Sequence, residues 1–580
     1  MRPQDEHHGR AMADSPTEIR SDTTSHETLA SEFRWRVPQP FNIAEAVCSR
    51  HARSAPQSPA VIEDDPEGGH CVVTFAELEA RSNSLAVGLQ QRGIGSGDRV
   101  AITLEQGADV LALHLACFKI GAISAPIASL YGTEGLAYRL NDCGARLLVT
   151  DQVGVAKLSP SAGVDLRARL PALEHIAIRA GRDEASAASE PSPMATVPGT
   201  LPLAELSTPI EDGGGPQLLE STADDPAILL YTSGTAGSPK GVLHAHRVLI
   251  GHLPGFQMVF DLAPHPGDVF WTPSVWSWVA SLVEVVLPAL YFGCPIVAGR
   301  ERFSIAGAYR ILSEHQVSCP FLAPAALRRM RADPPPADTE FALRTVMTGG
   351  EVSPPEVLEW TNRVLGATVN DIYGQTEANH IATGCRALFE TPAGAIGKVV
   401  AGRRCRILDE HGTEVEPGIS GEIALHRDDP IVMLEYWEQP QATAAKFGDG
   451  WIRTGDAGLI DADGFLYFQG RLDDMIMASG YRLGPEEVEG ALLAHEAVME
   501  AGVVGLPDPQ RGEIVAACVR LKPGFDGNDD LSAELQDFVK TRLAAHARPR
   551  RLEFVSALPA TSSGKTRRAE IRRQLLAGDA

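Results

Sequence analysis

Apolar runs of strand length alternate with amphipathic stretches of helix length between Phe75 and Thr150, and this alternation constrains the fold most. In chain order the expected elements are a helix at 75–92, a strand at 99–104, a helix at 110–120, a strand at 123–126, a helix after Thr133 and a strand at 146–150. Strands separated by helices at this spacing predict βαβ units and a mainly parallel sheet. A second alternating block spans about 225–385.

The pattern changes after Gly394. Short strands with Gly, Asp and Pro turns continue to Phe468 and predict an antiparallel, barrel-like subdomain. A small α+β unit follows, opening with a helix at 485–495. Because 580 residues exceed what one hydrophobic core supports, at least two domains are expected. Residues 1–36 are polar and without apolar periodicity, so a disordered tail is predicted there, with order beginning near Phe41.

The composition excludes several classes of protein. A net charge of −24 argues against a protein that binds nucleic acid by tracking its phosphates. The nine cysteines form no CxxC pair, and no secretory signal is recognisable, so a reducing, cytoplasmic location is expected. The apolar segment 279–298 contains Glu284 and Pro288, which favours a buried helix and a short strand over a membrane span. The sequence does not indicate an oligomeric state.

A loop of small residues, SGTAGSPKG, follows the predicted strand at 228–232. Its glycines let the backbone N–H groups approach an anion, its hydroxyls add donors, and Lys240 adds a positive charge. A polyphosphate site is therefore predicted. It is not a Walker A loop, because the GxxxxGK[ST] spacing fails and a glycine follows Lys240.

This loop, as YTSGTAGSPKG (231–241), resembles the phosphate-binding signature of the adenylate-forming superfamily. Five further motifs are similar and keep the family's order: TGGE (348–351), DIYGQTE (371–377), WIRTGD (451–456), GRLDDMIMASGYRLGPEEVE (470–489) and PATSSGKTRR (559–568). The resemblance covers about residues 37–575 and points to the acyl-CoA synthetase branch. It implies an α/β fold whose N-terminal domain, 37–472, has two packed αβ sheets and a small β-barrel-like subdomain. A hinge at Asp473 would join it to a smaller α+β C-terminal domain, 473–580.

The resemblance also implies which residues bind ATP and AMP. They are Thr232, Ser233, Gly234, Thr235, Ala236, Gly237, Ser238, Lys240, Gly350, Glu351, Asp371, Ile372, Tyr373, Gln375, Thr376, Asp456 and Arg471. Tyr373 would stack on the adenine, with Asp371 near its amine, and Asp456 would accept from both ribose hydroxyls. Thr376 would donate to a phosphate oxygen, and Glu377 would hold Mg²⁺.

Lys565 is implied as the residue that bridges the substrate carboxylate and the α-phosphate, although a lone lysine is more often a surface charge. Thr376, Glu377 and Lys565 are thus the expected catalytic residues. After rotation about Asp473, coenzyme A would meet a second set of residues. The set is Ser479, Gly480, Tyr481, Arg482 and, as a weaker candidate, Lys540.

The substrate is less constrained. In the acetate-activating branch a tryptophan fills the position of Gly374, so a larger acid is expected here. Trp276, Trp278 and Val279 are candidates for the pocket wall, although such a tryptophan pair is more often core. We expect a ligase that activates a short- to medium-chain acid with MgATP and transfers it to coenzyme A. Aromatic or branched acids, a carrier-protein acceptor and an inactive nucleotide-binding protein remain alternatives.

Replacing Lys565 by alanine should abolish adenylate formation, because the cation is needed while charge builds on the transferring group. Thioester formation from supplied acyl-AMP should survive. Assaying the two half-reactions separately tests this, and an equal loss of both would contradict the assigned role.

Overall fold

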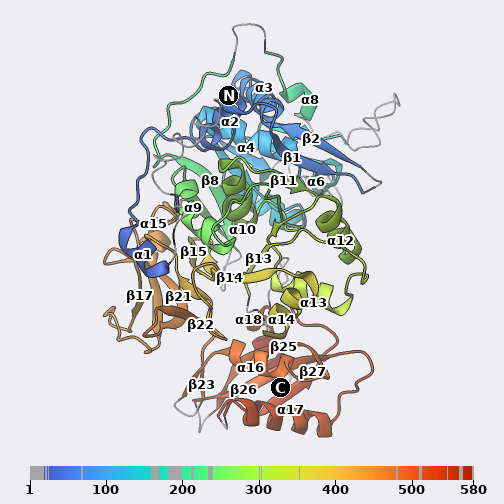
Figure 1. Ribbon diagram of the computed structural model, residues 1–580, viewed down its shortest axis with the longest axis vertical. Coiled ribbons are helices and arrows are strands. Elements are labelled where there is room, and N and C mark those ends of the chain that lie inside the picture. The colour runs from blue at the N-terminus through green and yellow to red at the C-terminus, as the bar shows by residue number, and fades with distance from the viewer. Residues whose placement is uncertain are drawn as a thin grey trace, which may run out of the picture.

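The computed structural model describes most of the chain. The described residues are 18–19, 23, 25–66, 69–158, 169–180, 199–210, 215–232, 239–299, 301, 303–351, 353, 355–478, 481–508, 512–544, 546–560 and 566–577. Figure 1 shows three sheets in the upper and middle parts of the molecule and a separate small unit at its lower end.

The first sheet has eight strands within the described ranges and is mainly parallel. In spatial order they are β19 (Glu435–Tyr436), β9 (Lys240–Ala245), β8 (Pro226–Thr232), β4 (Ile123–Pro126), β3 (Arg99–Ile102), β5 (Leu147–Thr150), β6 (His175–Ile178) and β7 (Thr200–Pro202). Only β9 and β19 run antiparallel to their neighbours. Strands β3, β4 and β5 confirm the predicted alternation.

The second sheet has five described strands. Their order is β12 (Cys319–Pro320), β10 (Phe270–Trp271), β11 (Ile296–Ala298), β1 (Pro59–Asp64) and β2 (His70–Thr74). The main hydrophobic core joins Val61 of this sheet to Val100 and Ile228 of the first, together with Leu111 of the helix α4. The two αβ sheets therefore pack around one shared core, as predicted.

Helices cover these two sheets and fill the space between them. They are η1 (Glu45–Ser49), α2 (Arg50–Ser54), α3 (Phe75–Gln91), α4 (Ala108–Ile120), α5 (Thr133–Asp142), α6 (Gln152–Leu158), α8 (Leu203–Leu206), α9 (Val248–Val259), α10 (Val279–Ser281), η3 (Leu282–Val286), α11 (Leu287–Tyr291), α12 (Ile305–Glu314), α13 (Pro324–Ala332), α14 (Pro355–Trp360) and η4 (Thr361–Leu365). A capping box between Thr74 and Glu77 fixes the start of α3.

The segment 279–298 is a buried helical stretch, α10–η3–α11, followed by strand β11, as predicted. No helix among the described residues is long and apolar enough to span a membrane.

The third sheet has nine described strands and is mainly antiparallel. Eight lie in the order β13 (Thr345–Gly349), β14 (Thr368–Gln375), β15 (Ala378–Thr383), β16 (Gly397–Val399), β22 (Phe465–Arg471), β21 (Trp451–Ile460), β18 (Gly421–His426) and β17 (Cys405–Leu408), and β20 (Phe447–Gly448) pairs with β21. The helix α15 (Pro440–Lys446) precedes β20. The predicted barrel-like subdomain is therefore extended by β13 to β15, which the sequence had assigned to the preceding block.

The C-terminal unit has a sheet of five described strands covered by helices, which confirms its α+β class. The strands are β24 (Tyr481–Leu483), β23 (Ile476–Ala478), β26 (Gly512–Leu521), β25 (Val498–Asp508) and β27 (Arg551–Phe554), and the helices are α16 (Pro485–Leu493), α17 (Asp529–Arg542) and α18 (Arg568–Ala577). The predicted helix at 485–495 corresponds to α16.

The predicted disordered tail is wrong for residues 25–36. Helix α1 (His26–Glu32) forms there, and Figure 1 shows it against the barrel-like subdomain. Leu29 is buried against Met258 and Val400, and Lys398 forms an ion pair of 2.8 Å with Glu27. The sequence did not reveal this contact because the segment is mostly polar. Leu29 is the buried residue of α1, and a single buried leucine leaves no visible periodicity. Residues 1–17 lie outside the described residues.

Replacing Leu29 by alanine should lower the free energy of unfolding by about 2 kcal/mol, as expected for truncation of a buried leucine. The matched control, Leu218→Ala, removes a side chain that is 64% exposed and should change stability by less than about 0.5 kcal/mol. Urea denaturation followed by circular dichroism measures both. Equal values for the two variants would show that α1 is not docked in solution.

Candidate active site

Asp456, on β21, lies at the centre of the predicted nucleotide site and is 4% exposed. Its Oδ2 accepts hydrogen bonds from the Tyr373 hydroxyl at 2.7 Å and from Gln375 Nε2 at 2.9 Å. Its Oδ1 accepts from Arg471 Nη1 at 2.9 Å. Burial raises the pKa of this carboxyl, and the nearby Arg471 opposes the rise. The structure thus brings together residues from three of the predicted motifs.

Lys446, at the end of α15, completes this group and was missed by the sequence reasoning. Its Nζ donates to Gln375 Oε1 at 2.9 Å and to the Thr454 carbonyl at 3.0 Å. Burial lowers the pKa of the ammonium, and the carboxylates of Glu377 and Asp456 oppose that change. Its position just before the WIRTGD motif was the available signal, but lysine is common at helix ends and carries little information there.

Glu377 and Lys240 both contact Tyr436, a second residue that the sequence reasoning missed. The Tyr436 hydroxyl donates to Glu377 Oε1 at 2.6 Å, and Lys240 Nζ lies 4.8 Å from the centre of the tyrosine ring. The Thr376 carbonyl accepts from His244 Nε2 at 2.8 Å. Strand pairing of β19 with β9 brings these residues together. A cation and a carboxylate therefore flank the place predicted for the phosphates.

The predicted adenine wall is formed by the paired ends of β13 and β14. Gly350 has φ of +90°, a conformation that favours glycine, and Glu351 forms an ion pair of 3.0 Å with Arg328. Asp371 is half-buried and accepts from the Ile372 N–H at 2.9 Å, and burial raises the pKa of its carboxyl to about 7. The Tyr373 ring is 7% exposed and packs on Phe468 at 5.5 Å between ring centres, which leaves a small surface for adenine.

Several predicted residues lie outside the described residues: Ser233, Gly234, Thr235, Ala236, Gly237, Ser238, Ser479, Gly480 and Lys565. The flanks of the first loop are described, and Thr232 pairs directly with Lys240 across β8 and β9. Three residues after Lys565 in the sequence, the Arg568 guanidinium contacts Asp474 at 3.3 Å and Glu489 at 2.7 Å. These contacts tie the start of α18 to the residue that follows the predicted hinge Asp473.

The predicted coenzyme A residues belong to the C-terminal unit. Tyr481 and Arg482 lie in β24, paired with Ala478 and Met477 of β23. Lys540 is exposed on α17, which Figure 1 places at the lower end of the molecule, far from the Asp456 site. The structure therefore does not bring Lys540 together with the nucleotide residues.

The residues predicted to line the acyl pocket differ in how deeply they are buried. Trp276 is 2% exposed and belongs to the main core, whereas Trp278 and Val279 are partly exposed at the start of α10. Gly374 is exposed, but a Cβ added there would lie 2.3 Å from the backbone nitrogen of His380. Close approach of β15 leaves no room for a Cβ at Gly374 unless the backbone shifts, and the expected opening of the acyl pocket by the missing indole stays a prediction.

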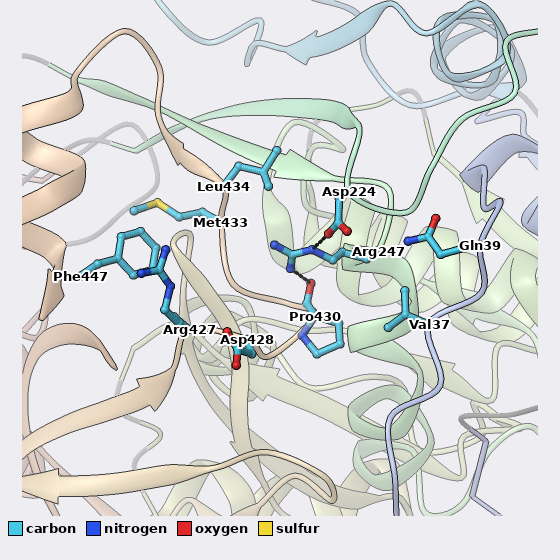
Figure 2. A pocket seen from close by; sticks show the side chains of 10 residues that line it. All are labelled: Val37, Gln39, Asp224, Arg247, Arg427, Asp428, Pro430, Met433, Leu434 and Phe447. Atoms are coloured by element: carbon cyan, nitrogen blue, oxygen red, sulfur yellow. Dashed lines mark hydrogen bonds and ion pairs between the residues drawn. The ribbon is translucent and has the colours of Figure 1, made fainter. Parts of the chain in front are cut away.

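A cavity of about 430 Å³ lies outside this site. Its walls are Val37, Gln39, Asp224, Arg247, Arg427, Asp428, Pro430, Met433, Leu434 and Phe447. Figure 2 shows Arg247 between Asp224 and the Pro430 carbonyl, and Arg427 against Phe447. None of the predicted nucleotide, coenzyme A or acyl residues lines it.

Comparison with known families agrees with this geometry. A model of the AMP-binding enzyme family matches residues 48–437, and a model of the AMP-binding enzyme C-terminal domain matches residues 487–565. The chain belongs to the AMP-binding enzyme family. The two matched regions contain the Asp371–Glu377 motif and the helix α17, respectively.

Members of this family with known names resemble the chain over nearly its whole length. An acetyl-coenzyme A synthetase of Bacillus subtilis is 31% identical over 92% of this chain and 90% of its own length. A benzoate–CoA ligase of Thauera aromatica is 32% identical over 93% and 97%. The crystal structure of an anthranilate CoA ligase with anthranoyl-AMP has a TM-score of 0.81 at 25% identity, covering 94% of this chain and 99% of that chain. These similarities support the acyl-CoA synthetase branch and an AMP-forming carboxylate–CoA ligase.

Replacing Tyr436 by phenylalanine should lower kcat/KM for ATP about tenfold, because a hydrogen bond to a charged group contributes about 1.5–3 kcal/mol. The Mg²⁺ concentration that gives half-maximal activity should rise, because the Glu377 carboxylate would no longer be held by the tyrosine hydroxyl. Steady-state kinetics at varied ATP and Mg²⁺ measure both effects.

Tyr309→Phe is the matched control. The Tyr309 hydroxyl is also buried and bonded, to the Met330 carbonyl at 2.9 Å, but far from Glu377 along the chain and in a different core cluster. Kinetics that match between the two variants would show that Tyr436 does not position Glu377.

Proposed function

We propose that this enzyme converts a carboxylic acid into its coenzyme A thioester in two steps, through an acyl-adenylate. The observation that carries the proposal is the convergence of Tyr373, Gln375 and Arg471 on the buried carboxylate of Asp456, next to the Glu377–Tyr436–Lys240 group. Five separate sequence segments supply these groups: Lys240, the motif with Tyr373, Gln375 and Glu377, Tyr436, Asp456 and Arg471. Such an arrangement suits a nucleotide whose ribose and phosphates are held at two adjacent places.

In the first step a carboxylate oxygen of the acid attacks the α-phosphorus of ATP, the bond to the bridging oxygen breaks and pyrophosphate leaves. Asp456 would accept from ribose hydroxyls. A carboxylate has about four acceptor positions, and three are already used by side chains of the chain. Binding of both hydroxyls would therefore replace at least one donor, and the Arg471 side chain, 31% exposed, is more accessible than the buried Tyr373.

The residues present fit a magnesium ion bound together with the phosphates. Glu377 is a carboxylate, and its Oε2 has no hydrogen-bond donor among the described residues, which leaves this oxygen for a hard cation. When bound, the ion supplies positive charge to the phosphate oxygens. Tyr436 holds the other oxygen of Glu377, and Lys240 adds a second cation at the same place. Lys565 would reach the α-phosphate from the C-terminal unit.

In the second step the thiol sulfur of coenzyme A attacks the acyl carbon, and AMP leaves with the bond electrons. We propose that the C-terminal unit, 473–580, turns about Asp473 between the steps, so that the hairpin with Tyr481 and Arg482 replaces Lys565. Arg471 contacts Asp456 at 2.9 Å and Asp473 at 3.3 Å. The Arg471 guanidinium therefore connects Asp456, the proposed ribose ligand, to the proposed hinge Asp473. Nucleotide binding at Asp456 would change the contacts of Arg471 and, through them, those of Asp473.

The proposed substrate is a short- to medium-chain acid. An aromatic acid is the second candidate, favoured by the similarity to a benzoate–CoA ligase and to an anthranilate CoA ligase. A carrier-protein thiol is the alternative acceptor.

Acid-dependent AMP release should require coenzyme A for sustained turnover, because the acyl-adenylate otherwise stays bound. The test is an AMP-release assay with acids from C2 to C12, benzoate and branched acids, each with and without coenzyme A. Continued release of AMP without coenzyme A, or release independent of the acid, would contradict the proposed reaction.

A further inference from the structure

A stripe of buried oxygens runs along the helical segment that follows Trp276. Ser277 lies in the turn before α10, Ser281 is the last residue of α10, and Glu284 lies in η3, which follows directly. The two hydroxyl oxygens and Glu284 Oε2 are buried, and none has a hydrogen-bond partner among the described residues. Glu284 lies in the π-helical turn η3, a type of distortion that is frequent at functional sites.

Two neutral histidines lie in the layers packed against this stripe. α9 packs against both η3 and β15, and it carries His252. His252 Nδ1 lies 2.7 Å from the Val248 carbonyl, which can only accept, so Nδ1 carries the hydrogen. Its Nε2 is therefore an acceptor, buried and without a partner among the described residues. Both ring nitrogens of His380, on β15, are also buried without such a partner, and one of the two is an acceptor because the ring is neutral.

The backbone of His380 is strained. Its φ is +38°, which side chains other than glycine rarely adopt, and such strain concentrates at functional sites. The missing Cβ of Gly255 on α9 leaves room for the ring, since an added Cβ would lie 2.9 Å from His380 Nδ1. Burial lowers the pKa of His252 to about 3 and that of His380 well below its usual value, so both rings are neutral at physiological pH.

Arg403 holds these elements together. Its Nε donates to the His380 carbonyl at 2.9 Å and its Nη2 to the Gly251 carbonyl at 3.0 Å. Its charge is balanced by Asp429 at 3.2 Å. Glu284 interacts with this guanidinium only at longer range, and burial raises the pKa of its carboxyl to about 8. The cluster therefore holds one carboxyl oxygen of Glu284, His252 Nε2 and both ring nitrogens of His380 without a hydrogen-bond partner among the described residues.

The cluster borders the proposed acyl pocket. The backbone nitrogen of His380 is the atom that an added Cβ on Gly374 would meet, and Gly374 is itself exposed beside the Asp456 site. Trp278 and Val279, the partly exposed candidates for the pocket wall, begin the helix that carries Ser281 and Glu284. Apolar side chains would be more stable than unpaired polar groups in such a place. His252 Nε2 and one nitrogen of the neutral His380 ring can only accept, so a hydrogen-bond donor is the partner that fits them.

We propose that the acyl pocket ends at Glu284, His252 and His380 and selects a carboxylic acid whose tail carries a hydrogen-bond donor, a hydroxyl or an amino group. This inference rests on the proposed ligase function and names its substrate class. The donor would bond to the Glu284 carboxyl and the His252 Nε2, which a plain hydrocarbon tail would leave unpaired.

The test compares acids that differ only in the donor: hexanoate and benzoate against their hydroxyl- and amino-substituted counterparts, with substitution at several positions. kcat/KM from AMP release with coenzyme A is measured for each acid. The wild-type enzyme should favour a donor-bearing acid over its plain counterpart by at least tenfold. Glu284→Leu should reduce this ratio to about one, mainly by losing activity on the donor-bearing acid.

Two further variants keep the test decisive. Glu284→Gln retains an acceptor but cannot ionise, so it should keep the preference if the donor is a hydroxyl and lose it if the donor is an ammonium group. His252→Phe should also weaken the preference and serves if Glu284→Leu does not fold. Glu63→Gln, a change at another buried glutamate bonded to the Ala108 N–H, is the matched control and should leave the ratio unchanged.

Turnover of plain acids without any preference for a donor, or a preference that survives both Glu284→Leu and His252→Phe, would overturn this inference alone. The absence of AMP release with every acid would instead overturn the ligase function on which it rests.

Discussion

The buried carboxylate of Asp456 is the constraint on which the rest of the site depends. An unpaired charge in a protein interior is costly, so a carboxylate that is 4% exposed must be surrounded by donors. Those donors come from β14 and β22, and their hydrogen bonds fix both strands relative to β21. Arg471 extends this arrangement to Asp473, so the nucleotide site and the proposed hinge share one guanidinium. The proposed two-step reaction with one mobile unit uses that connection.

Much of the fold could be predicted because the spacing of apolar residues along the chain indicates which segments form helices and which form strands. Strand β4 occupies the predicted range 123–126, and the apolar segment 279–298 is a buried helical stretch and a strand, as its interrupting Glu284 and Pro288 indicated. Long-range pairing was not predictable in the same way. β13 to β15 belong by sequence to the alternating block but join the antiparallel sheet through β16. Helix α1 was missed because its attachment depends on Met258 and Val400, hundreds of residues away.

The candidate site likewise has residues that local motifs predicted and residues whose roles depend on long-range contacts. Motif residues such as Tyr373, Gln375 and Asp456 meet in space, although the sequence separates them by about 80 positions. Lys446 and Tyr436 were missed because their contacts with Gln375 and Glu377 join segments that are 71 and 59 positions apart in the sequence. Gly374 was identified as important, but its physical reason, the close backbone of His380, exists only in three dimensions. The phosphate loop and Lys565 keep the roles inferred from resemblance as predictions.

The cluster of Glu284, His252 and His380 is proposed to select the acid, while the reaction itself is common to the family. Adenylate chemistry requires the groups around Asp456 and Glu377, whereas nothing in that chemistry requires an unpaired Glu284 or His252. Substrate choice and catalysis would thus be assigned to different groups of residues. Helix α9, which carries His252, packs against both η3 and β15, the elements that carry Glu284 and His380.

The central claim is that ATP and the acid react to form an adenylate and pyrophosphate before coenzyme A takes part. Exchange of radiolabelled pyrophosphate into ATP, measured without coenzyme A, tests it most directly. The account predicts label in ATP only when an accepted acid is present, because reversal of the first step requires the acyl-adenylate. Exchange without an acid, or an absolute requirement for coenzyme A, would contradict it.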